Sequence, residues 1–180
     1  KPKVEEAFSN VINAGLYIIE PEALALVPSG EKYDFSKQLF PKLLEMGWPI
    51  YAKKIEGVWF DVGSPTELIR AQHVLIEQRN TLPFPMPDGS VDGNGSFVSN
   101  SAHIGSNIEL HKSVIATGCS VGDRSTLLET VLMEGASVGS NVSLSGCILS
   151  PGAIVEDNVS AVNIVLGDSE CLKTNDNRLS

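Results

Sequence analysis

Two histidines, His103 and His111, stand where they could take part in catalysis. A neutral imidazole accepts a proton near neutral pH, so either residue could act as a general base. Each lies beside an aliphatic residue, Ile104 or Leu110, that is expected to point into a core. Because neighbouring side chains alternate along a strand, both imidazoles should point outward. A solvated surface histidine fits the same pattern, so both interpretations stay open.

The three cysteines, Cys119, Cys147 and Cys171, are an odd number and show no metal-ligand spacing. The sequence therefore predicts neither a disulfide framework nor a zinc site, as is typical of a reducing compartment. Cys119 and Cys147 fall at positions for small inward-facing residues in the repeat described below. Packing explains these two cysteines without catalysis.

The composition predicts a soluble globular protein, with 42% apolar and 19% charged residues. The net charge of -9, from 13 Lys and Arg against 22 Asp and Glu, disfavours nucleic acid or an anionic membrane as a partner. No stretch of the sequence is long and apolar enough to span a membrane, and the first residues lack the apolar centre of a signal peptide. We therefore expect small-molecule or protein partners and a cytoplasmic location.

The elements that would position these side chains begin with a repeat of period 17 over residues 91–167. Aliphatic residues recur at steps of six, six and five: Val98, Ile104, Leu110, Ile115, Val121, Leu127, Leu132, Val138, Leu144, Leu149, Val155, Ala161 and Leu166. A small or β-branched residue stands two positions before each: Ser96, Ala102, Ile108, Ser113, Cys119, Ser125, Thr130, Ala136, Val142, Cys147, Ala153, Val159 and Ile164. No position in either series is charged.

This repeat is similar to the hexapeptide pattern of single-stranded left-handed parallel β-helices. Each six-residue unit makes one flat strand and one corner of a triangular prism. The aliphatic residue fills the interior, and the small residue admits the tight turn. Stacked coils bury each position against its copies above and below, and the left-handed sense is an exception to the usual right-handed crossover.

The first half predicts mixed elements before a linker at residues 83–90, which is rich in Pro and Gly. The apolar run at 11–19 predicts a buried strand, and residues 49–63 predict two short strands around a turn at Glu56-Gly57. Short helices are expected at 21–27 and at 37–46, where Pro41 weakens continuity and Gly47 ends the helix. Ser64, Pro65 and Glu67 predict a capped helix over 65–79.

Four motifs follow one another in this half: Lys1-Pro2, Asn13-Ala14-Gly15-Leu16-Tyr17, Tyr33-Asp34-Phe35 before Phe40-Pro41, and Trp59-Phe60-Asp61-Val62-Gly63-Ser64-Pro65. In this order they resemble the C-terminal third of the catalytic domain of sugar-1-phosphate nucleotidyltransferases, which frequently carry a left-handed β-helix. The resemblance implies an α/β remnant of that catalytic domain over 1–82. The linker, the β-helix over 91–170 and a tail over 171–180 would follow.

The resemblance implies that a sugar-1-phosphate attacks the α-phosphorus of a nucleoside triphosphate, giving a nucleotide sugar and pyrophosphate. Lys1 would contact the sugar phosphate, Asn13 and Gly15 would line the sugar pocket, and Asp61 would help to hold Mg²⁺. GDP-mannose is the favoured product, and dTDP-, UDP- or ADP-glucose are alternatives. On the residues alone, a loop Asp and an Asn-Ala-Gly turn have ordinary structural explanations.

The sequence departs from the family because the glycine-rich triphosphate loop, the base-binding residues and the first magnesium aspartate are not in it. We expect this chain alone to be inactive and to be a piece of a complete enzyme. Its open sheet edges or its β-helix would favour a homo-oligomer. Two other functions stay open, a non-catalytic assembly or regulatory module and a hexapeptide acyltransferase, although the long protruding loop common in such acyltransferases is missing.

Overall fold

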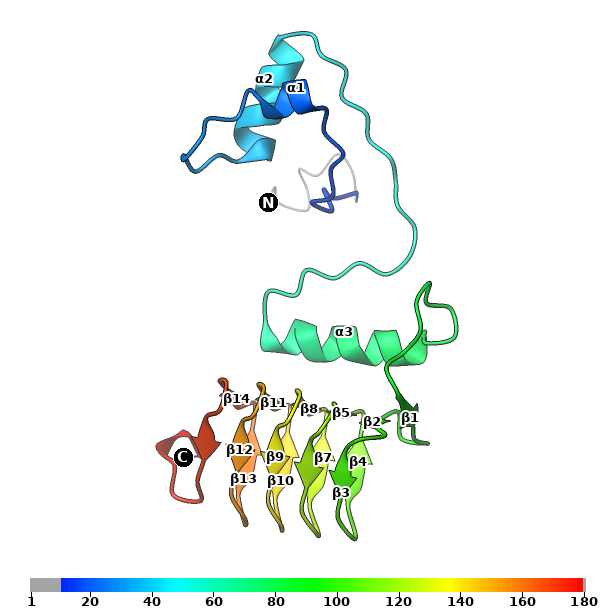
Figure 1. Cartoon of the computed structure of the whole chain (residues 1–180), viewed down its shortest axis with the longest axis vertical. Helices are drawn as coiled ribbons and strands as arrows, with labels where there is room; N and C mark the ends of the chain where they lie inside the picture. The colour runs from blue at the N-terminus through cyan, green and yellow to red at the C-terminus, as the bar shows by residue number, and fades with distance from the viewer. Residues whose placement is uncertain (1–10, 180) are drawn as a thin grey trace, which may run out of the picture. The chain divides into compact units, whose positions relative to one another are not determined.

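A computed structural model describes residues 11–179, so Lys1 lies outside the described residues. The chain divides into two compact units, Lys1–Trp59 and Phe60–Ser180, and Figure 1 shows the order of their elements. The second unit is a parallel β-helix with one long helix, so the predicted β-helix is confirmed, and the elements of the first unit within residues 11–59 are helical. No helix within 11–179 is long and apolar enough to cross a membrane.

The first unit contains three short helical elements. They are α1 (Pro21–Leu24), the π-helix η2 (Phe35–Leu39) and α2 (Phe40–Glu45). Pro41 falls in the first turn of α2, where its missing N–H costs least, so η2 and α2 follow each other directly. Gly47 adopts a φ of +73° just after α2, as a helix-ending glycine should.

A small core holds these helices together. Its buried members are Ala23, Leu39 and Leu43, and partly buried apolar side chains surround them: Ile19, Leu26, Val27, Tyr33, Phe35, Phe40 and Trp48. Helix α1 therefore packs against η2 and α2 through few side chains. The predictions of helices at 21–27 and 37–46 are confirmed, although α1 is shorter than expected.

The strands predicted at 11–19 and 49–63 were wrong. Residues 11–19 and 49–63 are irregular, and Ile18 and Tyr51 expose 105% and 89% of their surface. A strand needs a hydrogen-bonded neighbour, and none of the strands in 11–179 pairs with either segment. The bend at Gly57 was predicted correctly, with a φ of +109°.

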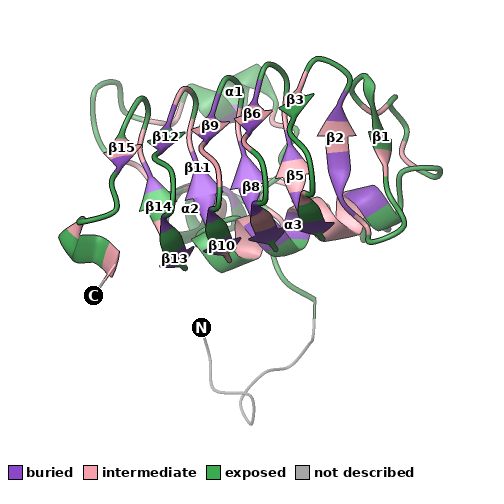
Figure 2. Cartoon of the chain, turned by 90° about the horizontal axis from the view of Figure 1, so that it is seen from below, coloured by how far each residue is buried: buried purple, intermediate pink, exposed green. Residues whose placement is uncertain are grey.

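The β-helix has three sheets, one for each side of a triangular prism, and Figure 2 shows buried residues concentrated in its strands. The six-stranded sheet contains β1 (Gly89–Val91), β2 (Phe97–Ser99), β5 (Val114–Ile115), β8 (Val131–Leu132), β11 (Ile148–Leu149) and β14 (Val165–Leu166). The five-stranded sheet contains β3 (His103–Ile104), β6 (Ser120–Val121), β9 (Ser137–Val138), β12 (Ile154–Val155) and β15 (Cys171–Leu172). The four-stranded sheet contains β4 (Glu109–His111), β7 (Thr126–Leu128), β10 (Ser143–Ser145) and β13 (Ser160–Val162). All pairs are parallel except the antiparallel pair of β1 and β2.

The interior contains the predicted aliphatic series. Leu127, Leu132 and Leu166 are completely buried, and Leu172 continues the series beyond the predicted positions. Ile104, near the first coil, is the exposed exception at 38%. Strand pairing is in register along the stack, so each side chain packs on its own copies above and below.

The predicted small positions are also confirmed. Cys119 and Cys147 are completely buried on different sides of the prism, and burial raises the pKa of both thiols. Coils approach so closely at Gly122 that an added Cβ would lie 2.6 Å from the backbone carbon of Gly139. Glycine at this position follows from backbone contact between coils rather than from a turn.

One corner of the prism carries a ladder of polar side chains on residues with positive φ. Arg124 Nε donates to Asn141 Oδ1 at 2.8 Å, and Asn141 Nδ2 donates to Asn158 Oδ1 at 3.2 Å. Their φ angles are 57°, 57° and 62°. Asn tolerates this left-handed conformation better than most residues, and the ladder satisfies its amide between coils.

Helix α3 (Pro65–Glu77) packs on the outer face of the six-stranded sheet. Ser64 caps it by accepting from the Glu67 N–H at 3.3 Å, as predicted. Ile69 is buried against Val131 and Ile148 of β8 and β11. A ring nitrogen of His73, Nε2, lies 2.6 Å from the Lys112 carbonyl oxygen and adds a polar contact to this apolar one.

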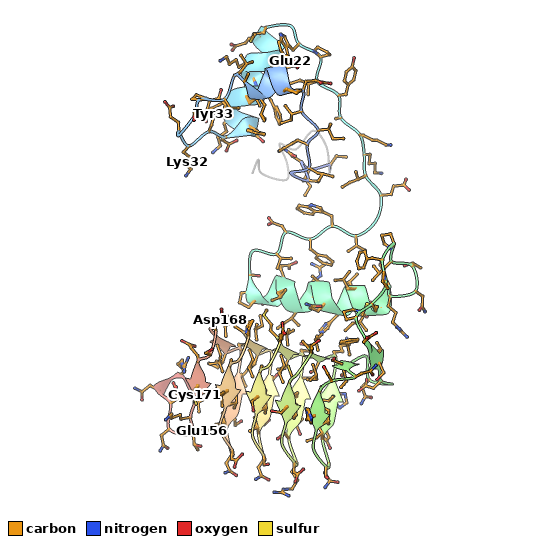
Figure 3. The ribbon with its side chains drawn as sticks, in the orientation of Figure 1. Glu22, Lys32, Tyr33, Glu156, Asp168 and Cys171 are labelled. Atoms are coloured by element: carbon orange, nitrogen blue, oxygen red, sulfur yellow. The ribbon has the colours of Figure 1, made fainter. Side chains whose placement is uncertain are left out.

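The last turn of the described chain covers the final coil. The 3₁₀-helix η3 (Asn177–Leu179) places Leu179 against the core of the β-helix. Arg178 pairs with Asp176 at 2.8 Å and with Glu170 at 3.2 Å. Nearby, Sγ of Cys171 lies 3.9 Å from Oε1 of Glu156, both labelled in Figure 3.

Candidate functional site

The Asn13-Ala14-Gly15 motif forms a compact loop held by the Asn13 side chain. Asn13 Oδ1 accepts from the Gly15 N–H at 2.9 Å. Asn13 Nδ2 donates to the Tyr17 hydroxyl at 2.7 Å and to Ser36 Oγ at 3.2 Å. Gly15 has a φ of +73°, which favours glycine, so the motif residues are suited to this turn.

Trp59 connects the last motif of the sequence to this loop. Its indole N–H donates to the Ala14 carbonyl oxygen at 3.2 Å, across 45 residues of chain. The bond fixes the middle residue of the loop from outside. The start of the Trp59–Pro65 motif therefore meets the Asn13–Tyr17 motif within the first unit.

An aromatic cluster joins a third motif to the same place. The Tyr17 ring lies 5.9 Å from that of Phe35 and 5.1 Å from that of Phe40, the second contact being edge-to-face. The rings of Phe35 and Phe40 are 6.3 Å apart. Tyr33, labelled in Figure 3, packs on the small core beside them. Three of the four motifs quoted above thus converge around one loop, which we call the Asn13 loop (residues 13–17).

Asp61 lies in the second unit, just before the cap of α3. Its side chain is exposed, and its carbonyl oxygen accepts from the Gly63 N–H at 2.8 Å. Within residues 11–179, no three His, Cys, Asp or Glu side chains gather closely enough to hold a metal ion. A single exposed carboxylate suits a hard cation such as Mg²⁺, which takes oxygen ligands, but Asp61 alone is not a complete site. The structure therefore brings Asn13 and Gly15 together in the first unit, and Asp61 belongs to the second unit.

The two histidines are exposed, as the sequence predicted, but they lie on different sheets. His103 is on β3 of the five-stranded sheet, and His111 is on β4 of the four-stranded sheet. A hollow of about 460 Å³ near the start of the β-helix is lined by Asp88, Ser99, Asn100, Ser101 and Thr117. Neither histidine lines that hollow.

Three residues of the Asn13 loop environment were not singled out from the sequence: Tyr17, Ser36 and Trp59. Tyr17 and Trp59 stood inside quoted motifs, so their types were visible but their contacts were not. Ser36 directly follows the Tyr33-Asp34-Phe35 motif. Its meeting with Asn13, 23 residues earlier, depends on tertiary structure.

Comparison with known proteins finds two families along the chain. Residues 1–78 match the family described as Nucleotidyl transferase. Residues 88–166 match the family described as GlmU-like, C-terminal hexapeptide. The predicted resemblance of the two segments is therefore confirmed.

Individual relatives carry names from several substrate groups. A UTP–glucose-1-phosphate uridylyltransferase of Synechocystis is 51% identical over 63 residues, which are 35% of this chain and 16% of the relative. A glucose-1-phosphate adenylyltransferase of Clostridioides difficile is 32% identical over 121 residues, covering 63% of this chain and 31% of the relative. A mannose-1-phosphate guanylyltransferase of Mycobacterium tuberculosis is 27% identical over 130 residues, covering 63% of this chain and 36% of the relative. The chain thus spans about a third or less of the length of these relatives.

Proposed function

We propose, on the premise that residues 1–78 belong to the nucleotidyl transferases and residues 88–166 to the GlmU-like hexapeptide proteins, that the chain is part of a sugar-1-phosphate nucleotidyltransferase. The complete enzyme would make a nucleotide sugar and pyrophosphate from a nucleoside triphosphate and a sugar-1-phosphate. The observation that carries this proposal is the convergence of three motifs around the Asn13 loop. Positioning and charge neutralisation would supply the catalysis.

The residue roles in this proposal follow the motifs. Lys1 would offset the charge of the sugar phosphate, and the Asn13 loop with Gly15 would form one wall of the sugar pocket. Asp61 would supply one carboxylate oxygen to Mg²⁺, with the remaining ligands coming from substrate phosphates, water and other parts of the enzyme. The bound cation would neutralise charge on the phosphates.

The sugar and base are proposed in the order in which we would test them. Mannose-1-phosphate with GTP comes first, supported by relatives named mannose-1-phosphate guanylyltransferases, one of them 41% identical over 69 residues. Glucose-1-phosphate with UTP or ATP comes next, because relatives named for those reactions match as well. The dTDP-glucose reaction is the remaining alternative.

The test is pyrophosphate release with Mg²⁺, these triphosphates and either sugar phosphate. We propose that the 180-residue chain alone releases none. Titration calorimetry on the same folded sample should nevertheless detect binding of one sugar phosphate. Rapid pyrophosphate release would contradict the proposal that this chain alone is inactive. Absence of binding by every sugar phosphate would contradict the proposed role of the Asn13 loop.

Several further proposals accompany this one. They are a cytoplasmic location, a catalytic segment over 1–82, a linker over 83–90, a β-helix over 91–170 and a tail over 171–180. A homo-oligomer through the β-helix is also proposed, and it gives the second candidate function, an assembly or regulatory module. Leu128 and Val162, exposed on the four-stranded sheet, favour that candidate. Sedimentation of the chain, with and without Leu128→Ser and Val162→Ser, would test it.

A further inference from the structure

The orientation of the Asn13 amide is fixed by its neighbours. The backbone N–H of Gly15 can only donate, so the atom that faces it, 2.9 Å away, must be the oxygen Oδ1. The other terminal atom is then the NH₂ nitrogen, which can only donate. Its two neighbours are the Tyr17 hydroxyl and Ser36 Oγ, so both hydroxyl oxygens must accept.

This arrangement determines what the two hydroxyl groups can do next. A hydroxyl that accepts a hydrogen bond keeps its own hydrogen for a different acceptor. Tyr17 is 38% exposed and Ser36 is exposed, so both hydroxyls can reach a ligand. Asn13, in contrast, uses both amide hydrogens within the protein, and its oxygen accepts one hydrogen bond from the Gly15 N–H. Asn13, which was predicted to line the sugar pocket, thus has no amide hydrogen left to donate to a ligand.

The Tyr17 and Ser36 side chains both lie on segments whose positions are fixed by contacts within the first unit. The Tyr17 ring packs against Phe35 and Phe40, which restricts where its hydroxyl can lie. Ser36 belongs to the π-helix η2, whose start is fixed in two ways. The Asp34 carboxylate accepts from the Lys37 N–H at 3.0 Å, and Gln38 Oε1 accepts from the Asp34 N–H at 2.8 Å. Short π-helical turns often occur at functional sites, and positions fixed in advance reduce the entropy lost on binding.

We propose that the hydroxyls of Tyr17 and Ser36 are a pair of hydrogen-bond donors for the oxygen atoms of a phosphorylated monosaccharide. Asn13 is a positioning residue that turns both hydroxyl hydrogens away from itself and toward the ligand. Because one nitrogen reaches both hydroxyl oxygens, the two donors are close enough to bind one small molecule. This inference rests on the proposed function and adds Tyr17 and Ser36 to the residues of the sugar pocket that Asn13 was predicted to line.

The test is titration of the full chain with mannose-1-phosphate and with glucose-1-phosphate, in the presence of Mg²⁺. Tyr17→Phe and Ser36→Ala each remove one hydroxyl and should weaken binding about fivefold to tenfold, the effect of one hydrogen bond. The double variant should weaken it about 50-fold if the two bonds are independent. Tyr51→Phe and Ser29→Ala, at exposed positions of the same unit, are the matched controls and should bind as the unchanged chain does.

Titrations with the free monosaccharide and with inorganic phosphate identify the oxygens that the donors bind. A loss in the double variant with the free sugar assigns the donors to sugar hydroxyls. A loss with inorganic phosphate assigns them to phosphate oxygens. Loss in either titration supports the proposal, and unchanged binding in both overturns it.

Asn13→Asp separates the positioning role from loop stability. An aspartate can still accept from the Gly15 N–H, but it has no hydrogens to donate. The two hydroxyls would then donate to the carboxylate and be lost to the ligand. We expect binding of the uncharged monosaccharide to fall as far as in the double variant, while hydrogen exchange of the Gly15 amide stays slow. Asn13→Ala should lose both.

Different results would overturn this inference and the proposed function. If Asn13→Ala abolishes binding while Tyr17→Phe and Ser36→Ala bind normally, Asn13 is itself the contact. That result overturns this inference and leaves the proposed function intact. If the unchanged chain, with a slow-exchanging Gly15 amide, binds no sugar phosphate, both the inference and the sugar-binding role of the Asn13 loop are wrong.

Discussion

The β-helix and the first unit use apolar residues in opposite ways. In the β-helix, aliphatic residues such as Leu127 and Leu132 are completely buried, and each coil pairs with a coil 17 residues away. In residues 11–59, the apolar run around Ile18 is exposed, and only Ala23, Leu39 and Leu43 form a buried cluster. A repeat contains its own pairing partners, whereas an isolated apolar run needs a partner from another part of the fold.

The boundary between the two structural units, after Trp59, does not coincide with the end of the nucleotidyl transferase match at residue 78. The nucleotidyl transferase match extends to residue 78, so it includes α3. The side chains of α3 nevertheless pack on the β-helix through Ile69, Val131 and Ile148. The last helix of one family segment is therefore stabilised by the other segment.

The largest effect is expected from Leu127→Ala, which truncates a side chain in the β-helix core. Leu127 is completely buried, so truncation removes apolar contacts and leaves a cavity in a stack that cannot easily collapse. We expect the free energy of unfolding to fall by about 2–5 kcal/mol, measured by urea denaturation followed by circular dichroism. Leu128→Ala is the matched control, because Leu128 is the next residue and is 43% exposed. Equal losses in the two variants would contradict the inward and outward assignment.

Ile69→Ala tests whether α3 belongs energetically to the β-helix. We expect the unfolding free energy of the second unit to fall by about 2 kcal/mol, at the lower end for such truncations because Ile69 lies at the edge of the core. Amide exchange along α3 should become faster while the first unit is unchanged. Thr66→Ala, at an exposed position of the same helix, is the control. If exchange in α3 stays as slow as in the unchanged chain, the β-helix does not hold α3 in place.

Trp59→Phe tests the first unit, whose buried apolar cluster is small. The change removes the indole donor to the Ala14 carbonyl but keeps an aromatic ring. We expect a loss of about 1 kcal/mol and faster hydrogen exchange at Gly15, observed by NMR. Trp48→Phe, which alters packing against the small core, is the control and should leave the Gly15 amide unchanged. An unchanged Gly15 amide in Trp59→Phe would mean that this bond does not support the loop.

The smallest effect is expected at the end of the β-helix. Hydrogen bonds from Arg178 lower the pKa of Asp176 from 3.8 to about 2. A carboxyl group with a lowered pKa in the folded state stabilises it fully above its unfolded pKa, and that contribution disappears as the pH falls toward 2. NMR titration of the Asp176 carboxyl carbon should show the low pKa, and Arg178→Gln should raise it toward the usual value. Lys173→Gln, which removes the partner of Glu156 instead, should leave it low.

How far the sequence could predict the fold depended on how local the interactions are. The 17-residue period assigned the inward positions correctly from Leu110 to Leu166, because coils repeat the same environment. The capped helix after Ser64 was equally local. The strand at 11–19 was wrong, because apolar residues predict burial only where a partner surface exists.

The sequence also contains an indication of the surface that α3 covers. The outward residues of the six-stranded sheet are apolar in every coil: Phe97, Val114, Val131, Ile148 and Val165. The other two sheets place Ser or a charged residue at many outward positions, such as Ser120, Ser137 and Glu109. Pairs of consecutive apolar residues at this period could have predicted a covered face, and α3 covers it at Val114, Val131 and Ile148. The meeting of Asn13 with Ser36 and Trp59 had no comparable indication, because it depends on tertiary contacts.

The close backbone approach at Gly122 and the polar ladder from Arg124 to Asn158 have a consequence for how this domain can change in length. Inserting or deleting a single residue within a coil would rotate every later side chain from the interior to a corner and separate the ladder partners. Gaining or losing a whole coil preserves every contact. Heritable length variation in such a domain should therefore come in steps of one complete coil, and single-residue indels should be confined to the segments outside the stack.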